Sequence, residues 1–591
     1  MKRRDLRKKI FEVVSRNGGH LSSNLGVVEA TIALLDVFDP KVDDIVWDVG
    51  HQAYAYKILT GRLNEIETIR KKNGLSGFTN PEESDCDRFK SGHASVSISA
   101  SLGLAKSKMI SGKKGKVVVF IGDGAMTGGL AYEGLNNCVG VSNLVVILND
   151  NSMSISKNVG GISDYLSKIR VHGAYINTKN ITKNILDKIP FVGDKLKKIL
   201  TDVNCEMRKL FVSRGTLFED LGFVYYGPID GHNIREMSKV FKIAKSSERP
   251  VLVHIMTRKG KGYEQAEKDP TKFHGVSSHY LKKDSENSSS SSFSSVFGGH
   301  ICKLARTNNK IYAITAAMSD GTGLTQFSRE FPNRFSDVGI AESHAVTFAG
   351  GLSAGGMIPI FAVYSTFLQR SVDQLIHDVS MQNLKLILCI DRAGLVGEDG
   401  ESHQGMFDVS ILNSIPNVVC YSPSYFDELK HYLNLAVDYD QSGILAIRYP
   451  KGSELFKPPF ITDEHKDFEI YGTDRDTLVI TYGRLFSIAS NIFCNIPEKF
   501  SLMKLNKIIP IDSSYMDACF SYKRVIFFEE SYESGSVSER FAYLLMKKQF
   551  KGEFKNICIN GFIKHATVEE QLRECFLDYE SMMRIIITNG I

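Results

Sequence analysis

The chain has 591 residues, which is too long for one hydrophobic core and predicts three or four domains. Its 43% hydrophobic and 24% charged residues are typical of a soluble globular protein. The net charge of +5 is spread along the chain, without a basic stripe interleaved with aromatic residues, so nucleic-acid binding is disfavoured.

The sequence also disfavours a membrane or secreted location. No apolar run reaches the ~18 residues that a membrane span needs, and the basic start, MKRRDLRKKIFEVV, lacks the apolar core of a signal peptide. Ten cysteines without a C-x-x-C pair indicate reduced thiols and no zinc site. These features predict a cytoplasmic protein that binds neither membrane nor nucleic acid.

Three Gly-His pairs mark the N-terminal part of the chain. Gly19-His20 follows a helical start, Gly50-His51 follows a short apolar strand, and Gly92-His93-Ala94 precedes a small-residue helix at 96–105. Glycine lets a loop approach a ligand, and histidine can donate to phosphate or carry protons near neutral pH. A single histidine is more often structural, but three such pairs at element ends favour a functional role.

The stretch from 117 to 151 predicts a strand–helix–strand unit, with buried parallel strands at 117–121 and 144–148. Asp123 and Asn151 follow these strands, at the sheet edge where ligands bind in open α/β folds. A carboxylate and an amide oxygen suit Mg²⁺, and the nearby glycines suit a diphosphate. An ordinary unit with turn residues at its ends explains the stretch equally well.

The rest of the first half is less regular. Residues 160–214 are Lys-rich and weakly patterned, which predicts short surface helices or a mobile lid. A strand at 250–256 precedes a Lys/Gly-rich loop at 258–263, a composition found in anion-binding loops and, more often, in plain solvated turns. His274 comes shortly before the Ser-rich run at 282–295, whose composition is typical of a linker.

The strand–helix pattern restarts after the linker and predicts the α/β fold class, with three α/β domains in series. The predicted domain limits are 1–281, a linker at 282–296, 297–462 and 463–591. Strands of the second and third domains are predicted at 311–315, 358–363, 386–390, 418–421, 444–447, 477–481, 525–528 and 557–559.

Acidic residues of the second domain also follow strands. Glu342 begins a small-residue helix, where a carboxylate is by default only a helix cap. Asp399 and His403 lie in a Gly- and acid-rich loop at 398–405. We expect both groups at the ligand-facing edge of the second sheet.

Two arginines follow strands of the same domain. Arg370 comes after Tyr364 and the start of a helix, and Arg448 closes the domain. A guanidinium at a strand end suits a substrate phosphate or carboxylate. A surface ion pair is nevertheless the commoner role of an arginine.

These residues fall in motifs that resemble those of one family, the 1-deoxy-D-xylulose-5-phosphate synthases, which are thiamine-diphosphate enzymes of the transketolase-like group. The resemblance runs from about residue 15 to 452, with a weaker continuation to the C-terminus. It implies a diphosphate-binding domain, a pyrimidine-binding domain and a transketolase-type C-terminal domain, in that order. The matching blocks are WDVGHQAY…KILTGR, SGHAS, IGDGAMTGG, ILNDNSMSIS, GTLFEDLGF, GPIDGH, EKDPTKFHGV, AESHAVTFAGGL, YSTFLQR, DRAGLVGEDGESHQG and RYPKG.

The resemblance implies thiamine diphosphate and Mg²⁺ as cofactors. Asp123, Asn151 and the carbonyl of Met153 match the metal ligands, and Glu342 matches the glutamate that activates the pyrimidine ring of the cofactor. The residues that match cofactor contacts are His51, Gly92, His93, Ala94, Gly124, Ala125, Asn151, Tyr263, Glu342 and Phe367.

The resemblance also implies a reaction: pyruvate and D-glyceraldehyde 3-phosphate condense to 1-deoxy-D-xylulose 5-phosphate and CO₂, the first step of a route to isoprenoids. It further implies a homodimer, with each active site in the crevice between the first two domains of one subunit. The implied catalytic residues are Glu342, His20, His51, His274, Asp399 and His403. The implied substrate contacts are Tyr364, Arg370, Arg448 and His403.

The sequence departs from the family pattern at three places. The residues that usually precede the first motif are missing, Ser343 stands where the family usually has Gln, and the Gly-rich stretch of the C-terminal domain is reduced at 533–538. We expect that domain to matter for the fold and the dimer more than for chemistry.

Two other functions stay open at this point. One is another thiamine enzyme, such as a transketolase or a 2-oxo-acid dehydrogenase component, and the YSTFLQR and GEDGESHQG blocks favour the synthase over it. The other is a catalytically silent homologue acting as a binding subunit. A competent residue at every catalytic position argues against this last alternative.

Overall fold

The computed structural model describes residues 2–151, 153, 160–169, 217–278, 291–438, 442–461 and 464–588. These described residues belong to two compact units. The first unit comprises Met1–Ile69 and Gly77–Lys283, and the second comprises Arg70–Ser76 and Asp284–Ile591. Most of the predicted lid at 160–214 and of the predicted linker at 282–295 lies outside the described residues.

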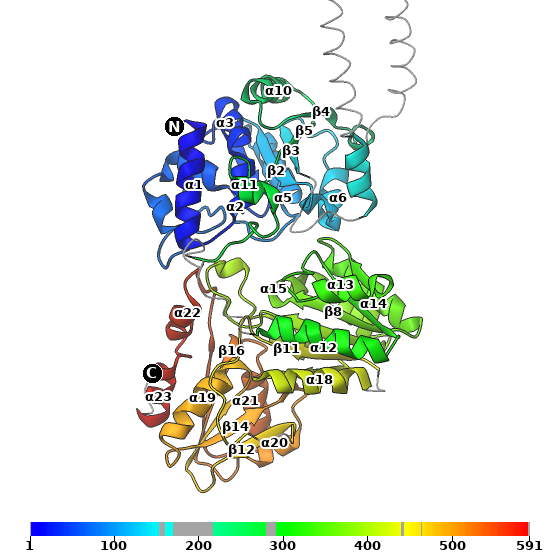
Figure 1. Cartoon of the computed structure of the whole chain (residues 1–591). Coiled ribbons are helices and arrows are strands. Elements are labelled where there is room, and N and C mark those ends of the chain that lie inside the picture. The colour runs from blue at the N-terminus through cyan, green and yellow to red at the C-terminus, as the bar shows by residue number, and fades with distance from the viewer. Residues whose placement is uncertain are drawn as a thin grey trace, which may run out of the picture. The chain divides into compact units, whose positions relative to one another are not determined.

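The first unit contains a five-stranded parallel sheet in the order β1-β2-β3-β5-β4 (Figure 1). The residues of β2 and β3 are buried almost throughout, on both faces of the sheet. Such strands are continuous apolar runs because helices cover both faces of a parallel sheet. The strands are β1 (Asp44–Trp47), β2 (Val117–Gly122), β3 (Leu144–Asp150), β4 (Val224–Asp230) and β5 (Val251–Met256).

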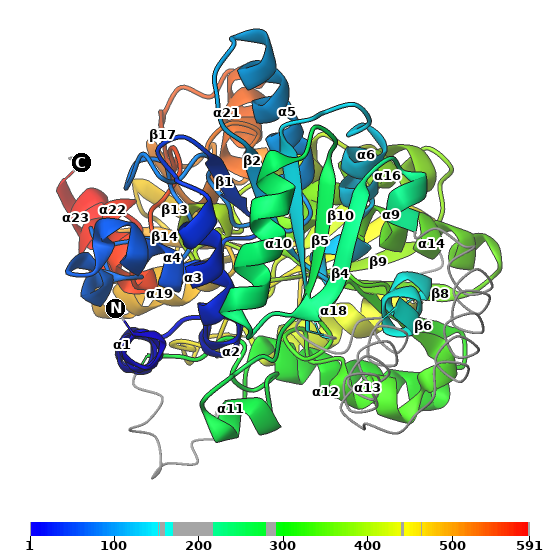
Figure 2. The same ribbon diagram turned by 90° about the horizontal axis from the view of Figure 1, so that it is seen from above.

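Helices α3 and α10 run side by side against this sheet (Figure 2). Leu34 of α3 and Phe241 of α10 share a core with alternate residues of β2 and β3, such as Val118 and Val145. The helices of this unit are α1 (Arg3–Asn17), α2 (Leu21–Gly26), α3 (Val28–Val37), α4 (Tyr54–Lys57), α5 (Ser97–Ile110), α6 (Gly129–Asn136), α9 (Leu217–Asp220), α10 (Ile234–Ser246) and α11 (Glu264–Lys268).

The second unit contains two sheets. The larger has seven strands in the order β15-β10-β11-β9-β8-β6-β7, and β15, from far later in the chain, pairs antiparallel with β10. Its strands are β6 (Ile311–Thr315), β7 (Phe335–Asp337), β8 (Ile358–Tyr364), β9 (Leu386–Asp391), β10 (Val418–Tyr421), β11 (Ile444–Arg448) and β15 (Lys507–Ile509).

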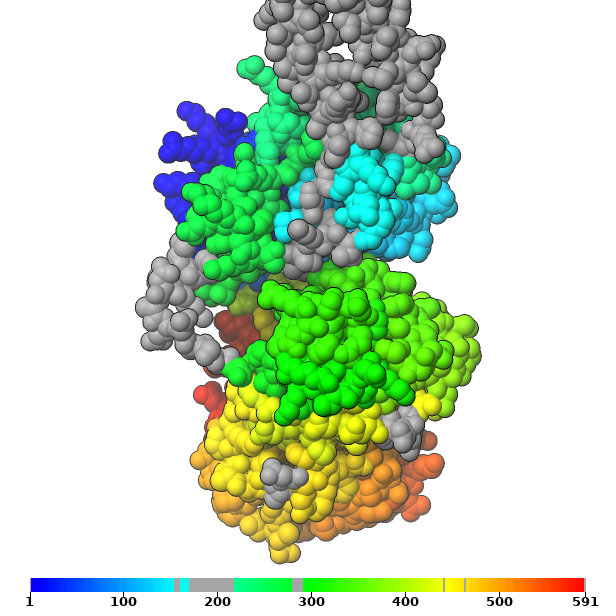
Figure 3. Space-filling view, turned by 45° about the vertical axis from the view of Figure 1, so that its right-hand side comes forward, coloured from blue at the N-terminus to red at the C-terminus, as the bar shows by residue number. Residues whose placement is uncertain are grey.

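The second sheet of this unit has five strands in the order β12-β14-β13-β16-β17, and only β12 pairs antiparallel. In the space-filling view, the green residues of this unit and the yellow to orange residues that follow them in the chain form one continuous surface (Figure 3). The strands are β12 (Phe468–Tyr471), β13 (Thr477–Thr481), β14 (Ser501–Leu505), β16 (Arg524–Tyr532) and β17 (Glu553–Ile559).

The larger sheet is covered on both faces. Helices α12 and α18 pack on one set of alternating strand residues, including Ile360 and Ile387, and α14 packs on the other set, including Phe361 and Leu388. The helices of this unit are α12 (Phe293–Thr307), α13 (Thr325–Glu330), α14 (Glu342–Ala354), α15 (Ser365–Leu368), α16 (Val372–Gln374), α17 (Asp408–Asn413), α18 (Phe426–Asp438), α19 (Arg484–Asn495), α20 (Ser513–Asp517), α21 (Val537–Lys547), α22 (Val568–Glu574) and α23 (Tyr579–Thr588).

The predicted α/β fold class is confirmed, and every predicted strand is present. Several strands extend beyond the predicted ends; the strand predicted at 525–528 spans Arg524–Tyr532, because Tyr532 pairs again with Ile559 after an irregularity that follows Phe528. The predicted domain limits stay predictions. Among the described residues, no helix combines the length and apolar composition that a membrane crossing requires.

Two neighbouring glycines of α12 test how tightly the second unit is packed. A Cβ on Gly298 would lie 2.0 Å from the carbonyl oxygen of Gly323, whereas a Cβ on Gly299 would meet nothing within 4 Å. We therefore expect Gly298→Ala to lower the free energy of unfolding by about 1–3 kcal/mol, because the backbone must shift. Gly299→Ala should raise it by roughly 0.5–1 kcal/mol, because alanine favours a helix interior.

Urea denaturation followed by far-UV circular dichroism measures both changes. Equal transition midpoints for the two variants would contradict the close contact between α12 and Gly323.

Candidate active site

The predicted metal ligands follow two neighbouring strands of the first unit. The last residue of β2, Gly122, lies beside Asn149 of β3, so Asp123 and Asn151 come at the same edge of the sheet. The side chain of Asp123 is buried, and Asn151 Oδ1 accepts a hydrogen bond from the backbone N–H of Met153 at 3.2 Å. A carboxylate, an amide oxygen and a nearby carbonyl are the hard donors that Mg²⁺ prefers.

Buried charges gather at this edge. Burial and then the neighbouring Asp150 raise the pKa of Asp123 to about 7. Burial lowers the pKa of Lys259 to about 8, against the opposing attraction of Asp123. Asp123 thus has a second carboxylate as well as a lysine beside it, and a divalent cation would neutralise the negative charge gathered there.

Two consecutive hydrogen bonds link Asp150 to His254 and Tyr225. His254 Nε2 lies 3.0 Å from Asp150 Oδ2, and His254 Nδ1 lies 2.8 Å from the hydroxyl of Tyr225. His254 is completely buried in the middle of β5. Sequence analysis did not predict these hydrogen bonds. The only hint of them in the sequence is one histidine in the otherwise apolar strand VLVHIM.

Three of the predicted catalytic residues form a triangle. The ring centres of His20, His51 and His274 are 5.4 to 5.6 Å apart in each pair. The structure therefore brings His274 beside two histidines that lie more than 200 positions earlier in the sequence. Their nitrogens can donate protons to, or accept protons from, a small molecule held among them.

Backbone contacts explain why the three rings meet. The completely buried Asn24 donates from Nδ2 to the carbonyl oxygens of His20 and His51, at 2.6 and 2.7 Å. Gly19 and Val276 exchange two backbone hydrogen bonds, which bring His274 beside the start of α2. These contacts fix the backbone of all three histidines.

One ring nitrogen of His51 has its hydrogen-bonding capacity unused by the described residues. Burial, with help from His20 and Lys259, lowers the pKa of His51 well below its usual value, so the ring is neutral near pH 7. Its Nδ1 is buried and has no hydrogen-bond partner among the described residues. Because buried polar atoms are normally paired, this nitrogen fits a ligand that supplies the missing contact.

Two turns predicted to contact the cofactor are linked. Ser95, directly after the Gly92-His93-Ala94 turn, donates from Oγ to the carbonyl oxygen of Ala125 at 2.7 Å. Asp48 fixes the same turn, because its carboxylate accepts from the backbone N–H groups of Ser95 and Ser97 at 2.9 and 3.1 Å. The Gly124-Ala125 turn and the His93 turn therefore lie together.

The loop after β5 is not a plain solvated turn. Gly26 lets α2 approach it closely, since a Cβ on Gly26 would lie 3.0 Å from the carbonyl oxygen of Arg258. As a result Lys259 is buried beside Asp123, although sequence analysis did not single it out. Tyr263 packs instead on Phe11 and Phe273, with its hydroxyl bonded to Gln265, so its cofactor contact stays a prediction.

In the second unit, Glu342 begins α14 and is buried. Burial raises the pKa of its carboxyl group, and Arg370 partly offsets this shift from an Nη1–Oε2 distance of 3.5 Å. Ser343 donates to the carbonyl oxygen of Arg370 at 2.9 Å. Arg370, predicted to contact substrate, is therefore the ionic partner of Glu342.

Aromatic and cationic side chains meet at the end of β8. The guanidinium of Arg392 lies 3.8 Å from the ring centre of Tyr364, and Phe367 stacks on the same tyrosine. His403 approaches Phe367 edge-on at 5.7 Å. Three predicted residues, Tyr364, Phe367 and His403, are thus brought together, and Arg392 is an addition that sequence analysis did not assign.

The substrate loop, defined here as residues 392–405, carries a second ion pair. Arg70 Nη1 donates to Asp399 Oδ1 at 2.6 Å, although the two residues are far apart in sequence. Burial lowers the pKa of His403, with Asp399 opposing and Arg70, Arg392 and a lysine assisting. The imidazole of His403 is therefore neutral near pH 7.

Arg448 does not take part in this cluster. It is buried, its Nε donates to Asp408 at 2.7 Å, and its Nη2 donates to the carbonyl oxygen of Glu530 at 3.0 Å. A guanidinium already paired in this way cannot bind a substrate phosphate without leaving Asp408 buried and uncompensated. This ion pair argues against the predicted substrate role of Arg448.

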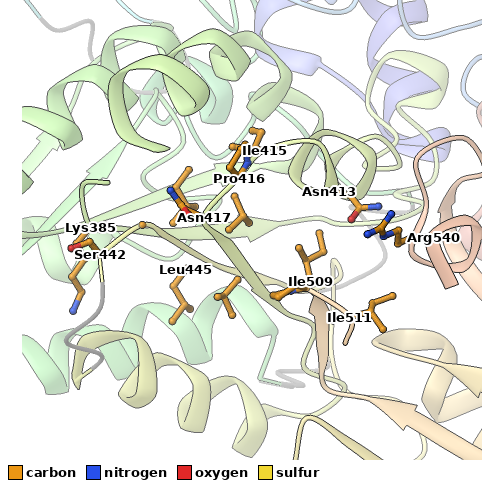
Figure 4. Close-up of a pocket in the computed structure, with 15 residues that line it drawn as sticks. Lys385, Asn413, Ile415, Pro416, Asn417, Ser442, Leu445, Ile509, Ile511 and Arg540 are labelled. Carbon is orange, nitrogen blue, oxygen red and sulfur yellow. The ribbon is translucent and has the colours of Figure 1, made fainter. Parts of the chain in front are cut away.

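A hollow of about 650 Å³ lies elsewhere in the second unit (Figure 4). Figure 4 shows Lys385 and Ser442 at one end and Asn413 and Arg540 at the other. Its lining includes residues directly before β9, β10 and β11, at the amino ends of these strands. The predicted site residues follow the opposite, carboxyl ends, so this hollow contains none of them.

The chain matches known families over most of its length. A sequence model of the family described as 1-deoxy-D-xylulose-5-phosphate synthase matches residues 3–257, and one of the transketolase pyrimidine-binding domain matches residues 289–454. The 1-deoxy-D-xylulose-5-phosphate synthase of Clostridium tetani is 43% identical over 593 residues, which are 99% of this chain and 95% of the relative.

Other similar proteins include the 1-deoxy-D-xylulose-5-phosphate synthase of Natranaerobius thermophilus, which is 52% identical over 452 residues, 76% of this chain and 71% of the relative. Among solved structures, a transketolase from Campylobacter jejuni is 15% identical with a TM-score of 0.44, over 99% of this chain and 98% of that chain.

Proposed function

The chain belongs to the 1-deoxy-D-xylulose-5-phosphate synthase family, and from this we propose that it joins pyruvate to D-glyceraldehyde 3-phosphate, with loss of CO₂, in a thiamine-diphosphate-dependent reaction. The product would be 1-deoxy-D-xylulose 5-phosphate, a precursor of isoprenoids. The observation that carries the proposal is Glu342, a buried carboxyl group with a raised pKa at the start of α14. Bound thiamine diphosphate supplies a carbon nucleophile and an electron sink for the decarboxylated unit.

Residues of the first unit would hold the diphosphate end of the cofactor. Asp123, Asn151 and the carbonyl of Met153 offer hard oxygens that would hold Mg²⁺, and the ion would neutralise negative charge of the diphosphate. The excess negative charge of Asp123 and Asp150 supports a cation there. Among the described residues no three His, Cys, Asp or Glu side chains gather around a metal position, and the proposed ligand set accordingly contains only one carboxylate, beside an amide and a carbonyl oxygen.

Glu342 would act on the pyrimidine end. Because burial raises its pKa, the carboxyl group binds a proton more tightly than an exposed glutamate does and can share it with a ring nitrogen. Arg370 limits that shift from 3.5 Å, so it sets the proton affinity of Glu342. We assign Arg370 this indirect role in place of direct substrate contact.

Each unit has its own polar groups that suit parts of the substrates. His20, His51 and His274 supply neutral or cationic ring nitrogens to substrate oxygens, and the lowered pKa of His51 favours its neutral form. Arg392, stacked on Tyr364, presents a guanidinium suited to a phosphate or carboxylate. We assign the anionic contact to Arg392 because Arg448 is already paired with Asp408.

The two alternative functions are less well supported. Relatives named 1-deoxy-D-xylulose-5-phosphate synthase match almost the full chain, which favours this activity over transketolase. The buried, unsatisfied Nδ1 of His51 among the described residues and the raised pKa of Glu342 are costly features that a silent binding subunit would not need. The homodimer and the cytoplasmic location stay predictions.

One assay tests the proposed activity. Purified protein with Mg²⁺ and thiamine diphosphate should release CO₂ from pyruvate when glyceraldehyde 3-phosphate is present, and the sugar phosphate product should accumulate in equal amount. Background CO₂ release with both substrates would refute the proposal. Product formation from a ketose donor without CO₂ would favour transketolase.

Glu342→Gln tests the role of the buried carboxyl group. The amide keeps the volume but cannot share a proton in the same way, so kcat should fall by about 10²–10⁴-fold. Glu330→Gln is the matched control, because Glu330 forms an exposed ion pair with Arg306 that contributes little. An unchanged kcat in Glu342→Gln would remove the proposed mechanism.

Asp123→Asn tests the metal position without relying on turnover. Loss of the charge should weaken binding of thiamine diphosphate in the presence of Mg²⁺ by at least about 100-fold. Trp47, the only tryptophan, stacks 4.5 Å from Phe120 on β2 and provides a fluorescence signal close to Asp123. Glu133→Gln, an exposed acid on α6, is the control; wild-type affinity in Asp123→Asn would refute the metal role.

A further inference from the structure

The substrate loop (residues 392–405) rests on residues from the C-terminal part of the second unit. The most extensive contacts come from residues 563–571, which we call the clasp segment; they precede and begin α22. Loops of this kind usually owe their mobility to sparse contacts and solvated backbone groups. Here side chains from the C-terminal part bind the loop backbone directly.

Three glycines let the loop approach so closely. A Cβ on Gly394 would lie 2.5 Å from the carboxylate of Glu530, and a Cβ on Gly400 would lie 3.1 Å from the side chain of His565. Gly397 lies between them, with the carbonyl oxygen of Ala566 at 3.4 Å from its Cβ position. All three have positive φ angles between 70° and 96°, so other residues would be strained there as well.

Gln571 forms the central contact. Its Oε1 accepts from the backbone N–H of Gly397, and its Nε2 donates to the carbonyl oxygen of the same glycine, both at 3.1 Å. The Nε2 group also donates to the carbonyl oxygen of Lys564 at 2.8 Å, and the side chain is completely buried. One glutamine thus fixes both backbone groups of Gly397 and ties them to the clasp segment.

A second pair of side chains holds the loop two residues earlier. Glu530 Oε1 accepts from the backbone N–H of Leu395 at 2.7 Å, and Arg484 Nη2 donates to the carbonyl oxygen of Leu395 at 2.9 Å. Glu530 and Arg484 are themselves paired and buried at less than a tenth of side-chain exposure. Both backbone groups of Leu395 are therefore fixed by one ion pair.

The clasp segment also reaches the partner of Asp399. His565 Nε2 lies 3.0 Å from the carbonyl oxygen of Gly74, in the short stretch Arg70–Ser76. That stretch presents Arg70, which binds Asp399 in the substrate loop. The clasp segment consequently holds both sides of the Arg70–Asp399 ion pair.

We propose that the clasp segment sets the position of the substrate loop for the reaction, and that Gln571 is the positioning residue at its centre. The proposal rests on the proposed function, because it gives the loop residues Arg392, Asp399 and His403 their roles toward substrate. Gln571 touches none of these side chains. It acts through the backbone of Gly397, and a displacement of about 1 Å there is enough to cost about 100-fold in rate.

Gln571→Ala tests the proposal against Glu574→Ala, an exposed position on the same helix. Gln571→Ala should lower kcat/KM for glyceraldehyde 3-phosphate by roughly tenfold to a hundredfold. The affinity for thiamine diphosphate, followed through Trp47, should stay within about twofold, because the hydrogen bonds of the Gln571 side chain go to the backbone of Gly397 and Lys564 and to no proposed cofactor ligand. Glu574→Ala should match the wild type in both measurements.

A second readout does not depend on catalysis. In the protein without cofactor, hydrogen exchange of peptides covering residues 394–405 should be about tenfold faster in Gln571→Ala, because the N–H of Gly397 loses its acceptor. If the wild-type protein lacks synthase activity, the proposed function fails, and this exchange experiment still decides whether Gln571 holds the loop.

Two results would overturn the proposal. One is a kcat/KM within about twofold of wild type together with unchanged exchange of the loop. The other is an equal loss of cofactor affinity and activity, which indicates general unfolding. If Gln571→Ala does not fold, Gln571→Glu replaces it, since the carboxylate keeps an acceptor for the N–H of Gly397 but cannot donate to its carbonyl; wild-type kcat/KM in that variant would also refute the proposal.

Discussion

The need to neutralise carboxylates removed from water governs the functional parts of this structure. Asp123 faces Lys259, Glu342 faces Arg370, Asp399 faces Arg70, and Glu530 faces Arg484. A buried charge without a partner costs several kcal/mol, so each of these acids requires a cation brought from elsewhere in the chain. Close approaches at glycines, such as Gly26 beside the loop that carries Lys259, help to bring such cations into place. The imperfect compensation of Asp123 and Glu342 leaves the pKa values of both carboxyl groups raised.

Much of the fold could be predicted from local patterns. Apolar runs such as 117–121 and 386–390 identify buried parallel strands, because both faces of the sheets are covered and no polar alternation interrupts the run. His20 and His51 were singled out by their glycine neighbours and His274 by the family resemblance, and the structure brings the three rings together. Motif order also carried Glu342, whose burial at the start of α14 no local pattern indicates.

The sequence did not allow us to predict which charged residues pair with one another. Nothing near Arg70 or Asp399 indicates that they pair across more than 300 positions, and the chain from Asp150 through His254 to Tyr225 joins three strands by tertiary contact alone. The roles of Arg370 and Arg448 show the same limit, because an arginine after a strand can bind a ligand or a buried acid with equal chemistry. In the structure, Arg370 pairs with Glu342 and Arg448 pairs with Asp408. The C-terminal part, which we expected to serve mainly the fold, supplies Gln571 and Glu530 to the substrate loop by contacts of this kind.

The antiparallel strand β15 links the two sheets of the second unit through backbone pairing. It completes the edge of the larger sheet by pairing with β10, although it comes from the part of the chain that builds the smaller sheet. A fragment cut after the larger sheet would therefore expose the backbone of β10 as an open template for pairing with other chains. Such a fragment would be prone to self-association, and the two sheets are best regarded as one piece for expression, exchange between relatives or redesign.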